Sequence, residues 1–173
     1  MNSNNEDEIE LKVDWDKIFM SQALLMALKS KDRRTKIGAL CVGKGHELVS
    51  GGFNGIPRGC SEKEERQVKP LKPYWYVHAE RNAIYNAARI GAKLQDTIMY
   101  CNVYPCPDCA QGIIQVGIKE IIIYRNPNTM GEELKETSGI SHEMLAEAGV
   151  KIRNFNDVIS KIYTVYDGIR YEL

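Results

Sequence analysis

The sequence predicts an α/β fold in which helices cover both faces of a mixed five-stranded sheet. Apolar segments with a helical period alternate along the chain with short runs rich in β-branched residues. Two of these runs are joined by a short glycine-containing turn, which predicts a hairpin, and the later runs are each followed by a helix. A hairpin followed by right-handed strand–helix–strand crossovers builds a three-layer α/β/α domain.

Each element follows from a local pattern. Asp14 can cap a first helix, in which Leu25 and Leu28 belong to the inward-facing apolar positions. The turn Gly43-Lys44-Gly45 joins the first two strands, and we expect its glycines to supply the positive φ angles of a tight hairpin. Pro107 stands in the first turn of a later helix, where its missing N–H costs nothing. The predicted helices are 14–31, 79–89, 106–116 and 132–148, and the predicted strands are 37–42, 47–53, 97–103, 119–124 and 150–152.

One domain accounts for most of the 173 residues. Residues 1–10 are polar and acidic and predict a disordered tail, whereas residues 11–154 carry the domain. Residues 155–173 are expected to extend the same domain in helical or extended form. Residues 54–77 predict a long irregular segment, and such a segment inside a compact domain is usually functional or disordered.

Composition limits the partners and the compartment. The formal net charge is zero, which argues against binding of polymeric nucleic acid through its phosphates. No apolar run approaches the roughly 20 residues of a membrane span, and the N-terminus has no apolar signal region. We therefore expect no membrane partner and a cytoplasmic location. An odd number of cysteines, two of them in a Cys-x-x-Cys, fits a reduced setting better than a disulfide framework.

Two short motifs concentrate the chemistry. His78-Ala79-Glu80 stands at the expected start of one helix, and Pro105-Cys106-Pro107-Asp108-Cys109 at the start of another. His78, Cys106 and Cys109 are good zinc ligands, and three protein ligands leave the fourth position open, as in catalytic zinc sites. Both helices are expected to begin on the same side of the sheet, so the ligands can meet. Either motif alone is weak, because Cys-x-x-Cys can also be a redox pair or half of a structural zinc site.

Glu80 is the predicted proton carrier. It follows His78 by two residues, so it can project toward the metal without ligating it. His-x-Glu combined with Pro-Cys-x-x-Cys is the pattern of zinc-dependent nucleobase deaminases, in which the glutamate moves protons. The pattern predicts hydrolytic loss of an amino group from C4 of a cytosine-type ring. Removal of Glu80 is expected to leave zinc bound and turnover nearly absent.

The other histidines and cysteines are expected to have no part in this chemistry. His46 in the hairpin and His142 at a helix start are predicted to lie at the surface. Cys41 and Cys101 lie in predicted strands and behave there as small core residues. Cys60 follows a glycine in the long segment and has no clear role, and a second metal role is the minor alternative for it.

Three motifs resemble the deoxycytidylate (dCMP) deaminase family. They are Phe53-Asn54-Gly55-Ile56-Pro57-Arg58-Gly59-Cys60, His78-Ala79-Glu80-Arg81-Asn82-Ala83-Ile84 and Tyr104-Pro105-Cys106-Pro107-Asp108-Cys109. The resemblance covers about residues 30–152 and includes Ser30-Lys31-Asp32. It implies a cytidine-deaminase-like fold and hydrolysis of dCMP to dUMP and ammonia, which feeds thymidylate synthesis. It also implies a homo-oligomer, commonly a hexamer, that dCTP activates and dTTP inhibits, with Mg²⁺ accompanying the regulatory nucleotide.

The resemblance also implies roles for single residues. Those matching His78, Cys106 and Cys109 bind zinc, and the one matching Glu80 is catalytic. Glycine N–H groups can approach the phosphates of a regulatory nucleotide while Arg58 supplies charge, although a tight turn explains the same residues equally well. The candidate residues for the regulatory nucleotide are Asn54, Gly55, Arg58 and Gly59. The candidate substrate-binding residues are Asn54, Ala79, Tyr104, Tyr124 and Arg125.

The substrate phosphate has several candidate partners at strand ends, where ligands bind in open α/β sheets. Arg125 is the foremost of them, and the others are Arg33, Arg34 and Lys36. Tyr104, beside the cysteine ligands, can pack on the base or belong to the core.

Three alternatives remain open. A tRNA adenosine deaminase shares the zinc motifs, but the zero net charge does not favour a basic RNA-binding face. A free-cytidine deaminase usually has cysteine where His78 stands. A non-catalytic zinc module would need no glutamate at position 80 and would usually have a fourth protein ligand.

Overall fold

The computed structural model describes residues 14–124, 132–157, 159, 163–166 and 169–172. The strands of the main sheet are β1 (Gly38–Val42), β2 (Leu48–Phe53), β3 (Ile98–Cys101), β4 (Glu120–Ile123) and β5 (Lys151–Asn154). The α-helices are α1 (Trp15–Leu28), α2 (Lys72–Trp75), α3 (Ala79–Ile90), α4 (Pro107–Gln115) and α5 (Glu132–Glu147). The predicted helices and strands are thus all present, and their ends differ by a few residues.

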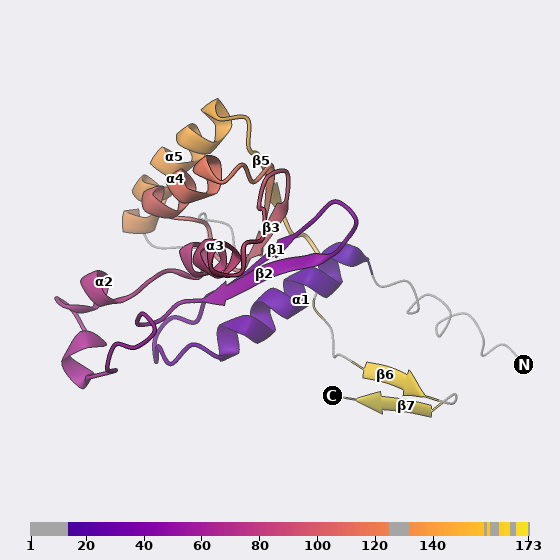
Figure 1. Cartoon of the computed structure of the whole chain (residues 1–173), viewed down its shortest axis with the longest axis horizontal. Coiled ribbons are helices and arrows are strands. Elements are labelled where there is room, and N and C mark those ends of the chain that lie inside the picture. The colour runs from indigo at the N-terminus through magenta and orange to yellow at the C-terminus, as the bar shows by residue number, and fades with distance from the viewer. Residues whose placement is uncertain (1–13, 125–131, 158, 160–162, 167–168, 173) are drawn as a thin grey trace, which may run out of the picture.

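The five strands form one mixed sheet in the order β2-β1-β3-β4-β5 (Figure 1). β1 runs antiparallel to both β2 and β3, whereas β3, β4 and β5 run parallel to one another. Helix α1 covers one face, and α3, α4 and α5 cover the other. The predicted three-layer α/β/α fold with a mixed five-stranded sheet is confirmed.

Alternate residues of each central strand supply two separate cores. On the face under α3, α4 and α5, the sheet contributes Cys41, Met99 and Cys101, all fully buried. On the opposite face Leu40 and Tyr100 pack against α1. This alternation follows from the two-residue period of a strand, and it confirms Cys41 and Cys101 as core residues.

Helix α1 differs from the prediction in its length and its inward face. It ends at Leu28, and Leu25 and Leu28 are 54% and 68% exposed rather than buried. The reason lies in Gly38, because a Cβ there would be 1.9 Å from the carbonyl oxygen of Ala23. The helix lies so close to β1 that small residues such as Ala23 form the contact and the large leucines are turned outward.

In the turn between β1 and β2, the residue with a left-handed backbone conformation is a histidine. His46 has φ 65°, and neither Gly43 nor Gly45 has a positive φ, so the expectation for these glycines was wrong. The exposed His46 ring stacks on Trp15 of α1 at a centroid distance of 4.5 Å. This stacking compensates for a backbone conformation that L-residues rarely adopt.

Residues 54–77, predicted as a long irregular segment, form a projection from the sheet that we call the lobe (Figure 1). The lobe contains a short 3₁₀ helix, Glu64–Arg66, and the single turn of α2. A bridge between Gly55 and Val77 closes its base. The lobe therefore begins at the end of β2 and returns to the chain immediately before His78.

The C-terminal residues form a second, two-stranded antiparallel sheet that the sequence pattern did not specify. Its strands are β6 (Tyr163–Tyr166) and β7 (Ile169–Glu172). The expected tail, residues 1–10, lies outside the described residues. Within the described part of the chain, no helix has the length and apolar character needed to cross a bilayer.

Candidate active site

Two helix N-termini bring the three predicted zinc ligands together. His78 immediately precedes α3 and Cys106 immediately precedes α4, both with extended backbone, and Cys109 lies in the first turn of α4. The carbonyl oxygens of His78 and Cys106 accept the first helical hydrogen bonds, from Asn82 and Ala110 at 2.9 Å. Partial positive charge at both helix starts favours thiolates at this point.

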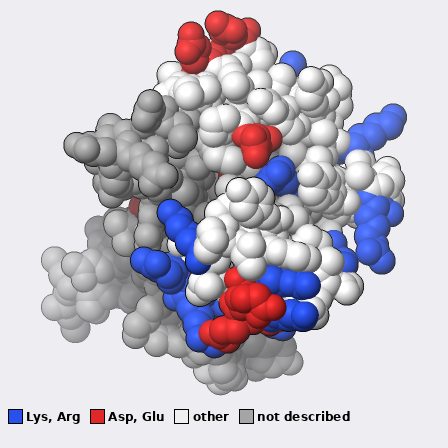
Figure 2. All heavy atoms as spheres, turned by 90° about the vertical axis from the view of Figure 1, so that its left-hand side faces the viewer, with Lys and Arg blue, Asp and Glu red and all other residues white. Residues whose placement is uncertain are grey.

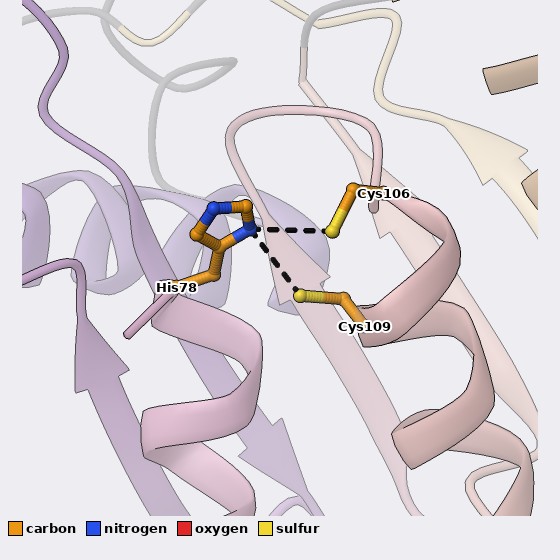
Figure 3. A group of neighbouring side chains, drawn as sticks. All are labelled: His78, Cys106 and Cys109. Atoms are coloured by element: carbon orange, nitrogen blue, oxygen red, sulfur yellow. Dashed lines mark hydrogen bonds between the residues drawn. The ribbon is translucent and has the colours of Figure 1, made fainter. Parts of the chain in front are cut away.

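The ligand atoms have the separations that a tetrahedral zinc ion requires. His78 Nδ1 lies 3.3 Å from Cys106 Sγ and 3.5 Å from Cys109 Sγ (Figure 3). With Zn–N and Zn–S bonds of about 2.1 and 2.3 Å, tetrahedral ligand atoms lie about 3.6 Å apart. A metal site needs His, Cys, Asp or Glu side chains whose ligand atoms lie close enough to bind one metal ion. Among the described residues, these three side chains form such a group. The cluster therefore fits zinc with one position left open.

Glu80 lies beside this cluster and is almost completely buried. The residue is 3% exposed, and its Oε2 has no hydrogen-bond partner within the described part of the chain. Burial raises the pKa of this carboxyl, although a hydrogen bond with the Cys109 thiol opposes the shift. A buried, unpaired carboxylate oxygen costs free energy unless a function requires it. Its position fits the predicted role as a proton carrier.

The two thiols influence each other. A hydrogen bond from the Cys109 thiol lowers the pKa of Cys106, and the same interaction together with burial raises the pKa of Cys109. The hydrogen bond to Cys106 raises the pKa of His78. A metal ion binds thiolates and neutral imidazole, so loading the site would release the protons that these groups share.

Helix α3 is held against β2 by close backbone contact and by side chains. A Cβ on Gly52 would lie 2.4 Å from the backbone nitrogen of Ala83. Asn82 donates to the carbonyl oxygen of Phe53, and Asn86 to that of Gly51. These contacts fix the start of α3, and therefore His78 and Glu80, relative to the sheet.

Asn54 is near the cluster, and its side-chain amide is hydrogen-bonded within the chain, although among the described residues its Oδ1 accepts only one hydrogen bond and keeps a second lone pair. The antiparallel bridge between Gly55 and Val77 places it opposite His78. Its Oδ1 accepts a hydrogen bond from the Ile37 N–H, and its Nδ2 donates to the Thr35 carbonyl oxygen and to Asp32 Oδ2. The side chain is therefore oriented by protein contacts, as a pre-positioned binding group would be.

The other candidate substrate-binding residues differ in how close they lie to the metal cluster and in how deeply they are buried. Ala79 is completely buried as the first residue of α3, next to the metal ligands. Tyr104 is buried in the core under α5, where its hydroxyl lies 3.0 Å from His142 Nδ1. Tyr124 is half-buried, and its ring is 5.8 Å from that of Phe155. Arg125, the foremost phosphate candidate, lies outside the described residues.

The regulatory candidates form the start of the lobe. The Gly55 N–H is already paired with the Val77 carbonyl oxygen at 3.0 Å. Exposed Arg58 donates to Asn86 Oδ1 of α3 at 2.7 Å. Gly59 has φ 81° in a turn closed by a hydrogen bond from the Cys60 N–H to the Pro57 carbonyl oxygen. Cys60 itself is exposed.

His46 and His142 are both exposed, as predicted, but His142 lies inside α5 rather than at its start.

Sequence reasoning also missed Arg81. Its Nη1 lies 3.9 Å from Asp108 Oδ2, and its buried Nε has no hydrogen-bond partner among the described residues. Its charge opposes the upward shifts in the pKa values of His78 and Cys109. The sequence did contain a signal for this residue: Arg81 stands in the first turn of α3, three residues after the ligand His78, and residues at that spacing are neighbours on a helix.

Comparisons with known proteins agree with this geometry. Residues 13–125 match the family described as the cytidine and deoxycytidylate deaminase zinc-binding region. Mouse deoxycytidylate deaminase is 36% identical over 163 residues, which cover 91% of this chain and 88% of the mouse protein. A probable deoxycytidylate deaminase of Drosophila melanogaster is 37% identical over 150 residues, 80% of this chain and 71% of that protein.

A solved structure extends the agreement to the fold. It is dCMP deaminase from the cyanophage S-TIM5 in complex with dCMP and dUMP, which is 26% identical and has a TM-score of 0.66. The match covers 84% of this chain and 100% of the cyanophage chain. The resemblance inferred from the three motifs is confirmed, and this chain belongs to the cytidine and deoxycytidylate deaminase family.

Proposed function

We propose that this protein hydrolyses dCMP to dUMP and ammonia. The observation that carries the proposal is the buried, unpaired Oε2 of Glu80 beside a cluster of three zinc-ligating side chains. The substrate follows from relatives named as deoxycytidylate deaminases and from the cyanophage enzyme that binds dCMP and dUMP. The product would supply thymidylate synthesis.

The metal would be held by His78 Nδ1, Cys106 Sγ and Cys109 Sγ. When bound there, zinc would act as a Lewis acid that lowers the pKa of water to about 7. Glu80 would take a proton from the attacking water and pass it to the ring nitrogen next to C4. The water oxygen would bond to C4, and Glu80 would then take the second proton from that oxygen and deliver it to the amino group. The C4–N bond breaks, the C4 oxygen becomes the carbonyl of dUMP, and the amino group leaves as ammonia, so that one water is consumed for each dUMP formed.

The surroundings of Glu80 suit this proton transfer. Its nearly complete burial raises the pKa of the carboxyl and so increases its affinity for the proton that it must hold. Ala79, the first residue of α3, carries one of the N–H groups that have no partner within the helix. This N–H could donate to a substrate acceptor beside the metal, and we retain Ala79 as a substrate contact.

The remaining substrate contacts are proposals of unequal support. Asn54 is pre-oriented beside His78 and is the best supported. Tyr104 points its hydroxyl toward His142, which favours the packing role over stacking on the base. Tyr124 stays a candidate at the end of β4, and Arg125 follows it as the proposed partner of the phosphate.

We also propose regulation by nucleotides in a homohexamer, with dCTP as activator and dTTP as inhibitor, each accompanied by Mg²⁺. Of the four candidates, exposed Arg58 supports this best, because a guanidinium can bind phosphate in a bidentate manner. Gly59 leaves open space beside it, whereas the Gly55 N–H is engaged in the bridge. We place the enzyme in the cytoplasm, where its thiolate ligands would remain reduced.

A substrate comparison tests the proposal. Zinc-loaded protein would be offered dCMP, deoxycytidine, CMP and tRNA separately, and ammonia release would be measured with and without dCTP–Mg²⁺ or dTTP–Mg²⁺. We expect turnover of dCMP that rises with dCTP and falls with dTTP. Turnover of deoxycytidine or tRNA instead would identify a free-cytidine or tRNA deaminase. Zinc-loaded protein that deaminates none of them would leave a structural zinc module.

A further inference from the structure

A buried ionic contact joins the lobe to the segment that precedes β1. The carboxylate of Asp32 is 4% exposed, and Lys72 of α2 places its ammonium 2.5 Å from Asp32 Oδ2. The same ammonium lies 5.1 Å from the centre of the Tyr76 ring. Lys72 is thus held between a buried anion and a buried aromatic ring, close to the point where the chain returns to His78.

Asp32 is the centre of a hydrogen-bond network. Its Oδ1 accepts the backbone N–H groups of Arg34 and Thr35 at 2.9 and 3.2 Å, and its Oδ2 accepts from Asn54 Nδ2 at 3.3 Å. The pKa of Asp32 would be raised by burial, but the hydrogen bonds from Lys72 and these backbone groups hold it below its usual value. The negative charge therefore organises residues 32–35 and the Asn54 amide together.

The network continues to the metal cluster. Ser30 Oγ donates to the Asn54 carbonyl oxygen at 2.8 Å, and Asn54 Oδ1 accepts the Ile37 N–H. The next residue, Gly55, is bridged to Val77, directly before His78. Lys72, Asp32, Asn54 and the Gly55–Val77 bridge thus form one continuous set of contacts that ends at the residue before His78. This set includes Ser30 and Asp32 of the Ser30-Lys31-Asp32 motif, which the chemistry of deamination alone does not explain.

Two further ion pairs join the lobe to the same segment, but both are exposed. Lys31 pairs with Glu62 at 2.7 Å and Arg33 with Glu64 at 3.2 Å. Figure 2 faces this side of the molecule and shows acidic side chains set among lysines and arginines. Exposed pairs contribute little to stability, because water and salt screen them. The Lys72–Asp32 pair is different, because Asp32 is buried and the Lys72 side chain is only 22% exposed, so loss of Lys72 leaves an uncompensated buried charge.

We propose that Lys72 is a positioning residue, which acts through Asp32 to hold the Asn54 amide beside the metal cluster and so sets the affinity for the nucleotide substrate. Lys72 itself touches no reacting atom. The position of the lobe is thereby coupled to substrate binding, so a ligand that shifts α2 would change KM more than kcat. The inference rests on the proposed function for its kinetic part, whereas the ordering of residues 32–37 can be measured without substrate.

Three variants and one control test this inference. Lys72→Met removes the ammonium while keeping the length of the side chain, and Lys72→Arg restores the charge. The double variant Asp32→Asn/Lys72→Met leaves no unpaired buried charge. If Lys72→Met alone does not fold, the double variant takes its place in every comparison. Lys63→Met is the control, because Lys63 is an exposed lysine of the same lobe. Steady-state kinetics with dCMP and amide hydrogen exchange without substrate would be measured for each.

We expect Lys72→Met to raise KM for dCMP about tenfold, a size typical of coupling through a network of contacts. It should change kcat by less than about twofold, because the interaction that is lost contributes to substrate binding and not to the chemical step. Exchange at the Arg34, Thr35 and Ile37 amides should become faster. Lys72→Arg should recover most of the KM, and Lys63→Met should behave as wild type. An unchanged KM, or loss of kcat alone, would overturn the inference, as would unchanged exchange. If wild-type protein does not deaminate dCMP, the proposed function fails, and hydrogen exchange still decides whether Lys72 orders this segment.

Discussion

Replacement of Gly52 by alanine is expected to displace α3 and, with it, His78 and Glu80. A Cβ at this position would lie 2.4 Å from the Ala83 nitrogen and 2.5 Å from the Ala79 carbonyl oxygen. Non-bonded heavy atoms in contact are separated by about 3.5 Å, so the strand and the helix would have to move apart by about 1 Å. Both contacts are with backbone, which cannot rotate away as a side chain can.

The site should register this displacement strongly, because Glu80 and the ligand His78 stand on the helix that moves. A misplacement of about 1 Å in a catalytic group can cost about 100-fold in rate. We therefore expect kcat/KM for dCMP to fall about 100-fold, which corresponds to about 2.7 kcal/mol of transition-state stabilisation. Zinc content should also fall, since the separation of His78 from the cysteine ligands would change.

The neighbouring Gly51 provides the matched control. A Cβ there would lie 3.3 Å from Leu40 Cδ1, a flexible side-chain atom, and 3.5 Å from both the Ala39 carbonyl oxygen and Met26 Cε, which is an ordinary van der Waals distance. Gly51→Ala should therefore keep kcat/KM within about threefold of wild type, as substitutions that the neighbours can accommodate do. Wild-type kcat/KM in Gly52→Ala, or an equal loss in both variants, would refute the reasoning.

Other predictions concern the site and the acid stability. Glu80→Gln should retain zinc at the wild-type level but lose about 10³-fold in kcat, because only proton transfer is removed; loss of the metal, measured by elemental analysis, would contradict this. Cys109→Ala should lose zinc, and the wild-type protein should lose thermal stability on chelation, since a metal that binds the folded state stabilises it; equal melting temperatures with and without chelator would argue against the cluster. Burial alone would raise the pKa of Asp16, but hydrogen bonds from Arg153 and Tyr100 hold it below its ordinary value. This stabilisation is present above about pH 4 and is lost as the pH falls, because the unfolded state then binds more protons. Urea unfolding at pH 6 and pH 3 should therefore show a larger loss of stability in wild type than in Asp16→Asn, and parallel losses would exclude this role for Asp16.

The sheet and the metal cluster were predictable because their signals are local and repeated. The apolar runs that form β3 and β4 specify parallel strands, and strand–helix crossovers bring His78 and Cys106 to the same end of the sheet. Spacing within two short motifs was therefore enough to assemble three ligands that are up to 31 residues apart in the chain.

Features that depend on tertiary contacts were not predictable in the same way. Leu25 and Leu28 fit a helical period, but the close approach of α1 to Gly38 turns them outward. The positive φ of His46 accompanies stacking against Trp15, which lies 31 residues earlier. The engagement of Asn54 by Asp32 also depends on packing between separate segments. Periodicity carries no information about such partners.

The most direct test of the account is a zinc titration of metal-free protein with dCMP as substrate. Ammonia release should be absent at the start, rise in proportion to added zinc, and reach its plateau at one zinc ion per chain, as the single cluster of described ligands requires. Full turnover by protein without metal, or no turnover of dCMP by protein that has bound one zinc ion per chain, would contradict the account.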